Sequence, residues 1–157
     1  MRFEWLIIDG YNVLHTQPHL VTLMRSDMEQ ARHQLVRQIE AATLAMADQV
    51  TLVFDGKERG RDEGLSRSRF EVIYASKELS ADGLIERLVD KATTPERICV
   101  ITSDTLEQRT VSGSGAYTMS AHEFMNQLNK QHKPTTYSTQ MRPAQKPKLG
   151  DIFPDSL

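Results

Sequence analysis

The 157-residue sequence has one cysteine, 6% aromatic residues and no long hydrophobic run. A lone thiol, Cys99, excludes a disulfide framework and a cysteine-based zinc site, and its apolar neighbours favour a place in the core. No stretch approaches the roughly 18 apolar residues of a membrane span. The opening run 5–8 is cut by Asp9, so it is too short for a signal-peptide core. We therefore expect a cytoplasmic protein with no membrane association.

Neither sign of charge dominates: the sequence has 19 Lys and Arg residues and 21 Asp and Glu residues, which gives a formal net charge of −2. This balance gives no overall attraction for a polyanion, so any binding of nucleic acid must depend on local basic patches. The 39% hydrophobic content excludes wholesale disorder. With 8 glycines and 6 prolines in no fixed period, a collagen-like or repeat chain is excluded too.

Short β-branched runs alternate with helical periods, which predicts an α/β fold with a mainly parallel sheet. Strands are expected at 3–8, 50–54, 70–74, 98–102 and 116–119, the third near a sheet edge. Helices are expected at 27–47, 81–92, 106–109 and 121–131, with Ser26, Ser80 and Ser120 as the caps of the first, second and fourth. Residues 57–69 are charged and carry glycine, so a mobile loop is expected there. The length fits one domain, predicted at 1–131, with a proline-rich extended tail at 132–157.

Acidic residues stand where the predicted strands end. Asp9, Asp55 and Asp104 each follow a strand, and Asp82 falls in the first turn of the helix 81–92. The carboxyl ends of strands in an open parallel sheet line the crevice where ligands bind, so the four acids are expected to converge. Each acid also has a local explanation: a turn for Asp55, the helix dipole for Asp82 and a helix cap for Asp104.

A cluster of carboxylates implies a cation. Like charges raise one another's pKa, and hard oxygen ligands select Mg²⁺ or Mn²⁺. Such an ion offsets the repulsion and activates water against a phosphodiester.

Several motifs resemble one family in the same order along the chain. They are the residues at 8–13 (Ile-Asp-Gly-Tyr-Asn-Val), 53–56, 80–89, 100–104, 107–108 and 119–124. From about residue 2 to residue 131 the chain is similar to the YacP-like branch of NYN-domain proteins, which are PIN-like nucleases. The resemblance implies a three-layer fold with a parallel sheet flanked by helices, and a divalent-metal site that hydrolyses RNA. Because the family includes a ribosome-associated endoribonuclease, mRNA and the ribosome are the expected partners.

The resemblance also implies roles for single residues. Asp9, Asp82 and Asp104 would bind Mg²⁺ or Mn²⁺. Asn12 would orient a ligand, water or phosphate, and Ser103 would support the site by hydrogen bonding. Asp55 and Glu86 would support the metal ligands without binding the ion themselves. Glu86 lies one helical turn beyond Asp82, so it would orient that carboxylate or a metal-bound water. The alternative for Glu86 is a side chain that faces solvent.

RNA binding is expected from the loop that follows Asp55, because phosphates need neutralising and bases need stacking partners. Its basic residues are Lys57, Arg59, Arg61, Arg67 and Arg69. Tyr11 would stack on a base. The alternatives are a solvated loop and a packing role for Tyr11. Arg25, Arg32 and Arg37 add positive charge or solvate the outer helix face.

The leading hypothesis is therefore a metal-dependent endoribonuclease. The alternative is a non-catalytic RNA- or ribosome-binding module on the same scaffold. A phosphoacceptor receiver domain is disfavoured, because it needs paired acids after the first strand and a lysine after the last. Gly10-Tyr11-Asn12 and Tyr117-Thr118-Met119 supply neither.

Overall fold

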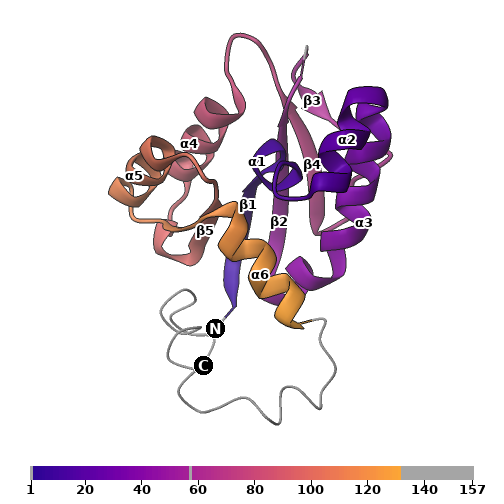
Figure 1. Ribbon diagram of the computed structural model, residues 1–157. Coiled ribbons are helices and arrows are strands. Elements are labelled where there is room, and N and C mark those ends of the chain that lie inside the picture. Colours follow the sequence, from indigo (N-terminus) through magenta and orange to yellow (C-terminus); the bar gives the residue numbers. More distant parts are fainter. Residues whose placement is uncertain (1, 57, 132–157) are drawn as a thin grey trace, which may run out of the picture.

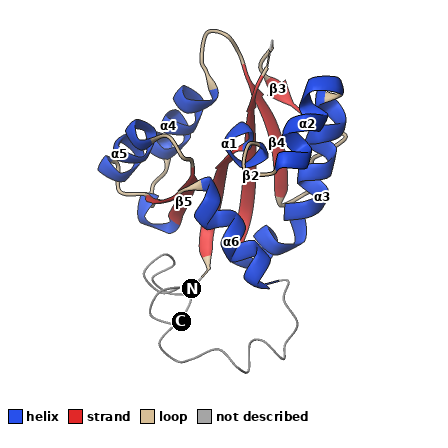
Figure 2. Ribbon diagram, in the orientation of Figure 1, coloured by secondary structure: helices blue, strands red, loops and turns tan. Residues whose placement is uncertain are grey.

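A computed structural model describes residues 2–56 and 58–131 (Figures 1 and 2). Its centre is a six-stranded sheet in the order β3-β4-β2-β1-β5-β6. The strands are β1 (Phe3–Asp9), β2 (Ala47–Asp55), β3 (Gly60–Arg61), β4 (Phe70–Ala75), β5 (Ile98–Ile101) and β6 (Tyr117–Met119). All neighbouring strands pair in parallel except β3, which is antiparallel to β4. The prediction of a mainly parallel α/β fold is confirmed.

Helices cover both faces of the sheet and make three layers. One face carries α1 (Gly10–Leu14), α2 (Pro18–Ser26), α3 (Met28–Met46) and α6 (Ala121–Gln131). The other carries α4 (Ala81–Lys91) and α5 (Thr105–Gly113), with a 3₁₀ turn at Pro95–Arg97 before β5. Figure 2 shows the helices on either side of the strands. In the described ranges 2–56 and 58–131, none of the helices combines the length and apolarity needed to cross a bilayer.

Strand β1 is the centre of both hydrophobic cores. Leu6, Ile7 and Ile8 are fully buried. Successive side chains of a strand point to opposite faces, so Leu6 and Ile8 pack beneath α3 while Ile7 packs beneath α4. Burial on both faces explains why the sequence of this strand is continuously apolar up to Asp9.

The helices differ from the sequence-based expectations at several ends. Asp27, not Ser26, caps α3, because its Oδ1 accepts the Gln30 N–H at 3.0 Å and Ser26 belongs to the end of α2. Helices α1 and α2 were not predicted, since α1 has only five residues and α2 buries only Leu20. The expected helix at 106–109 is the nine-residue α5, which extends further because Val111, at the end of its second turn, is buried in the core. Ser80 and Ser120 cap α4 and α6 as predicted.

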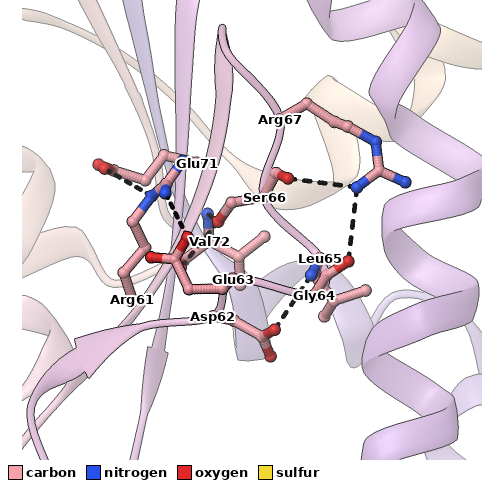
Figure 3. A network of polar contacts seen from close by, with 9 residues as sticks. All are labelled: Arg61, Asp62, Glu63, Gly64, Leu65, Ser66, Arg67, Glu71 and Val72. Atoms are coloured by element: carbon pink, nitrogen blue, oxygen red, sulfur yellow. Dashed lines mark hydrogen bonds and ion pairs between the residues drawn. The ribbon is translucent and has the colours of Figure 1, made fainter.

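The segment between β2 and β4 is bound to the sheet rather than free. Figure 3 shows its polar contacts: Ser66 is buried, and its Oγ accepts the Val72 N–H at 2.9 Å. Asp62 accepts the Leu65 N–H at 3.0 Å and the Tyr74 hydroxyl at 2.6 Å. Residues 58–69 therefore form a folded flap over the edge of β4, not the loose loop that was expected.

Gly10 has no room for a side chain, since a Cβ atom there would overlap the buried Phe54 ring. We expect Gly10→Ala to lower the free energy of unfolding by about 1–3 kcal/mol, because overpacking a rigid core forces its neighbours to move. Urea unfolding measures this change.

Gly60→Ala is the matched control, because a Cβ at Gly60 meets no atom within 4 Å. Its free energy of unfolding should stay within about 0.5 kcal/mol of the wild-type value. Equal effects of the two substitutions would contradict the packing argument.

Candidate active site

The carboxyl ends of β1, β2 and β5 lie at one edge of the sheet. The chain runs outward from β1 through β2 to β4 and then crosses back to β5, so the strand order reverses between β1 and β5. Ligands of open α/β sheets bind outside the strand ends at such a switch point. Asp9 ends β1 and Asp104 follows β5, so these two acids flank the switch point.

Asp9 is a buried carboxylate, with only 5% of its surface exposed. It caps α1 by accepting the Asn12 N–H at Oδ1 (3.3 Å), and Asn12 Nδ2 donates to Oδ2 (3.0 Å). Burial, together with the smaller effect of the Asp82 and Asp55 charges, raises the pKa of Asp9 to about 6 despite the bond from the Asn12 backbone amide. Keeping Asp9 ionised in this buried position therefore costs free energy.

Asn12 connects Asp9 to the turn after β5. Its Oδ1 accepts the Ser103 N–H at 2.6 Å while its Nδ2 contacts Asp9. Ser103 in turn accepts the Ala121 N–H at its Oγ (3.1 Å), which joins the turn to the start of α6. These contacts agree with a positioning role for Asn12 and Ser103.

Asp104 is an exposed carboxylate at the start of α5. Its Oδ1 accepts the N–H groups of Leu106 (2.9 Å) and Glu107 (3.2 Å), so Asp104 caps the helix. Its own N–H donates to the Thr102 hydroxyl at 3.2 Å, which fixes the turn. The cap that the sequence suggested as a local explanation is present, and it holds the acid at the crevice.

Asp55 fixes the helix that carries Asp82. Its Oδ1 accepts the Ala81 N–H at 2.8 Å, which ties the end of β2 to the first residue of α4. Asp82 is half-buried and has no hydrogen-bond partner among the described residues. Burial raises the pKa of Asp82, and the charges of Asp104, Asp55 and then Glu86 raise it further.

Glu107 is a member of this acidic group that the site prediction omitted. Its side chain is 3% exposed, and its Oε1 is enclosed without a hydrogen-bond partner in the described part of the chain. Burial raises the pKa of Glu107 well above its ordinary value, and the neighbouring carboxylates of Glu86 and Asp82 add to the effect. A signal was available: Glu107 and Val111 lie one helical turn apart, so a glutamate occupies the apolar face of α5.

The acids fit a divalent cation by chemistry and by charge. The pKa values of Asp9, Asp82 and Glu107 are each raised in part by the charges of neighbouring acids, among them Asp55, Glu86 and Asp104. Carboxylate oxygens are the ligands that Mg²⁺ and Mn²⁺ prefer, and the enclosed Oε1 of Glu107 has no internal partner. Within residues 2–56 and 58–131, however, no three potential ligands share a metal-binding geometry. The structure thus gathers the acids at one edge of the sheet but does not bring three described carboxylates onto one ion position.

The predicted RNA-binding loop only partly reaches this crevice. Gly60 pairs with Tyr74 near the carboxyl end of β4, so the exposed Arg59 lies on the crevice side. Arg61 forms ion pairs with two glutamates, Glu63 and Glu71, which offset its charge (Figure 3). Lys57 lies outside the described residues.

Arg67 and Arg69 lie at the other end of β4. The expectation that the whole loop overhangs the acids is therefore wrong for these two residues. The flap runs antiparallel to β4, and the Arg69 carbonyl accepts the N–H of Val50 near the start of β2. At about 3.3 Å per residue, the start of β4 lies about 16 Å from its end. The sequence places these arginines after Asp55 in the chain, but the direction of the flap separates them from it.

Tyr11 packs at the crevice edge. Its ring meets the Phe54 ring edge-on with centroids 5.2 Å apart, and its hydroxyl donates to the Asp55 carbonyl at 3.2 Å. The packing alternative for Tyr11 therefore has contacts to support it, while stacking on an RNA base stays a prediction.

The fold, and the acids gathered at the carboxyl edge of its sheet, define a PIN-like α/β protein of the nuclease type. The chain belongs to the YacP-like NYN domain family, whose family model matches residues 6–156. It is 31% identical over 125 residues to "Uncharacterized protein YacP" of Bacillus subtilis (strain 168), which covers 78% of this chain and 74% of that protein. The resemblance stated from the sequence is confirmed, and membership supports a nuclease-type function related to RNA.

Solved structures of a relative share the fold. The crystal structure of Rae1 (YacP) from Bacillus subtilis matches with a TM-score of 0.67 and 27% identity, over 97% of this chain and 88% of that chain. A tryptophan-to-leucine mutant of that protein matches with a TM-score of 0.65 and 30% identity, over 81% and 76% of the two chains. These matches confirm the architecture.

We expect Glu107→Gln to stabilise the protein above pH 5. Because the pKa of Glu107 is raised on folding, the native state binds more protons than the unfolded state above the ordinary glutamate pKa of 4.5. The free energy of unfolding of the wild type therefore falls as pH rises through this range. The variant lacks this pH-dependent loss of stability. Its free energy of unfolding should exceed that of the wild type by about 1–3 kcal/mol at pH 8 and equal it at pH 4.

Denaturant unfolding at pH 4 and pH 8 measures the difference. Glu78→Gln is the control, because Glu78 is exposed and its variant should match the stability of the wild type at each of the two pH values. A Glu107→Gln effect that does not change with pH would contradict the assignment of a buried, protonated acid.

Proposed function

We propose that the protein is a divalent-metal-dependent endoribonuclease that hydrolyses RNA phosphodiester bonds. The observation that carries this proposal is the group of mutually repelling carboxylates at the switch point between β1 and β5. Asp9, Asp82 and Asp104 would hold Mg²⁺ or Mn²⁺. The bound ion would supply an activated water and offset the charge that develops on the phosphate.

The other polar residues would orient these ligands. Asn12 holds both oxygens of Asp9 in place through its amide and backbone N–H groups. Asp55 holds the start of α4, and thereby Asp82, through the Ala81 N–H. Glu107 would supply a further carboxylate once a cation lowers its pKa.

The substrate we propose is mRNA, with cleavage on the ribosome as the setting. The alternative is a non-catalytic RNA- or ribosome-binding module. One observation supports this alternative: within the described residues, no three carboxylates lie in a metal-binding geometry. Metal binding separates the two functions.

We expect Mn²⁺ or Mg²⁺ to raise the melting temperature at pH 7.5. An ion at 100 times its Kd stabilises a folded protein by about 2.7 kcal/mol, which is about 5–10 °C for a domain of this size. Differential scanning fluorimetry with Mn²⁺, Mg²⁺ and the chelator EDTA measures the shift.

The double variant Asp82→Asn/Asp104→Asn should lose the shift. A shift of the same size in this variant would remove the metal assignment. No shift in the wild type at millimolar ion would favour the non-catalytic module.

We expect Asp82→Asn and Asp104→Asn to reduce RNA cleavage at least about a hundredfold, since each removes a charge that the metal needs. Asp82 makes no hydrogen bond among the described residues, so its amide variant should fold normally. Asparagine caps helices as well as aspartate does, so Asp104→Asn keeps the start of α5. Cleavage of end-labelled RNA and of mRNA on translating ribosomes, with Mn²⁺ present, measures the loss.

Asp90→Asn is the matched control. Asp90 lies on α4 like Asp82, but its carboxylate is exposed and accepts the Ser114 hydroxyl far from the crevice. Its cleavage rate should equal that of the wild type. Full activity in both Asp82→Asn and Asp104→Asn would contradict the proposed mechanism.

A further inference from the structure

Arg32 of α3 is held among aromatic rings at the carboxyl edge of the sheet. The centre of its guanidinium lies 5.2 Å from the Tyr74 ring centroid and 5.6 Å from the Phe54 ring centroid. Its Nη2 donates to the Tyr11 hydroxyl at 3.3 Å. Cation–π contacts of this kind fix the plane of the guanidinium, so the group is held in one orientation.

This cation has no acidic partner in the described part of the chain. The ion pairs there involve Arg2, Arg61 and Arg97, and Arg32 is in none of them. Its Nε is enclosed without an acceptor, and its Nη1 makes no hydrogen bond with a described residue. A guanidinium carries five N–H donors, and with Nε enclosed those left for a ligand are on Nη1 and on Nη2 beside its bond to Tyr11.

Arg32 lies close to the acidic crevice but on the other side of the strand ends. Phe54 and Tyr74 belong to the core beneath α3, and Asp55, the next residue after Phe54, points to the α4 side and bonds to Ala81. Tyr11 spans the two sides, because its hydroxyl accepts from Arg32 and donates to the Asp55 carbonyl. A strand of RNA that crosses the edge of the sheet would meet the acids and this cation in succession.

We propose that Arg32 binds a backbone phosphate of the RNA next to the one at the acidic crevice. The inference rests on the proposed function, which brings a polyanion to a group of carboxylates that repels it. A planar guanidinium matches a phosphate with two parallel hydrogen bonds, which an ammonium group does not offer. Arg32 is thus a positioning residue for the substrate, and Tyr11, Phe54 and Tyr74 hold it in place.

Binding of a fluorescent single-stranded RNA, with metal removed by EDTA, tests this inference without cleavage. Arg32→Gln should weaken binding about tenfold and lower the slope of log K against log salt by about 0.7, the value for one phosphate contact on a single strand. Arg32→Lys should recover only part of the affinity, because lysine keeps the charge and loses the paired hydrogen bonds. Arg37→Gln is the matched control: Arg37 is exposed on the same helix, and its variant should bind like the wild type.

A set of RNAs, each with one neutral methylphosphonate linkage, locates the contact. The wild type should lose affinity about tenfold at one linkage, and Arg32→Gln should lose nothing further there. If Arg32→Gln alters the melting temperature, Arg32→Lys replaces it in the same comparison. If the losses of affinity from the Arg32 substitution and from the neutral linkage do not add, the Arg32 side chain contacts that phosphate directly.

The outcomes separate this inference from the proposed function. If the wild type cleaves RNA while Arg32→Gln binds with the same affinity and salt slope, the inference is overturned and the nuclease function stands. If the wild type binds RNA but cuts none, the nuclease function fails while the Arg32 comparison still decides the inference. A wild type that binds no RNA in EDTA and cleaves none with Mn²⁺ present overturns both.

Discussion

Repulsion among carboxylates at the carboxyl edge of the sheet is the constraint on which the rest of the site depends. Asp9 is buried at the end of the central strand, and Asp82 and Glu107 approach it from helices on the α4 side. The charge of Asp82 raises the pKa of Asp9, and the charges of Asp82 and Asp9 raise that of Glu107, so bringing these acids together costs free energy in their charged forms. A protein stabilised by burial alone would not gather these groups, and sites that do so are often functional.

The scaffold offsets this repulsion with hydrogen bonds that leave the acids in place. Asn12 bonds both to Asp9 and to the Ser103 backbone, so one amide side chain joins the ends of β1 and β5. Asp55 and Asp104 accept backbone N–H groups at the starts of α4 and α5. Because the helix starts are bonded to the acids, the positive ends of two helix dipoles face the cluster and reduce its electrostatic cost.

The net charge of −2 conceals an uneven distribution. Acids concentrate at the crevice, whereas Arg32 stands beside it without an acidic partner among the described residues. Arg61 is paired with glutamates, and Arg69 lies just before β4, at the end of that strand opposite the acids. The number of basic residues in the flap therefore overstates the positive charge available to a polyanion at the site, and a single arginine on α3 matters more than several in the flap.

Much of the fold follows from the sequence, because its physical causes are local. The continuous apolarity of residues 3–8 marks a central strand, and the apolar stripe through Leu35 and Ile39 marks α3. Short elements escaped prediction: α1 has five residues and β3 has two, too few for a period to show. The cap of α3 was placed one residue early, since Ser26 and Asp27 are both good caps and only the end of α2 decides between them.

For the site, the sequence by itself determined that acids follow strands, and strand ends meet at one edge in any parallel sheet. Tertiary structure decided which other residues join them. Glu107 enters the cluster because α5 turns that face toward α4, and Arg67 leaves it because the flap runs back along β4. Arg32 reaches the edge from a helix distant in sequence, through rings on two strands. Local patterns record burial and turns, whereas contacts between distant segments depend on the direction in which each connection runs.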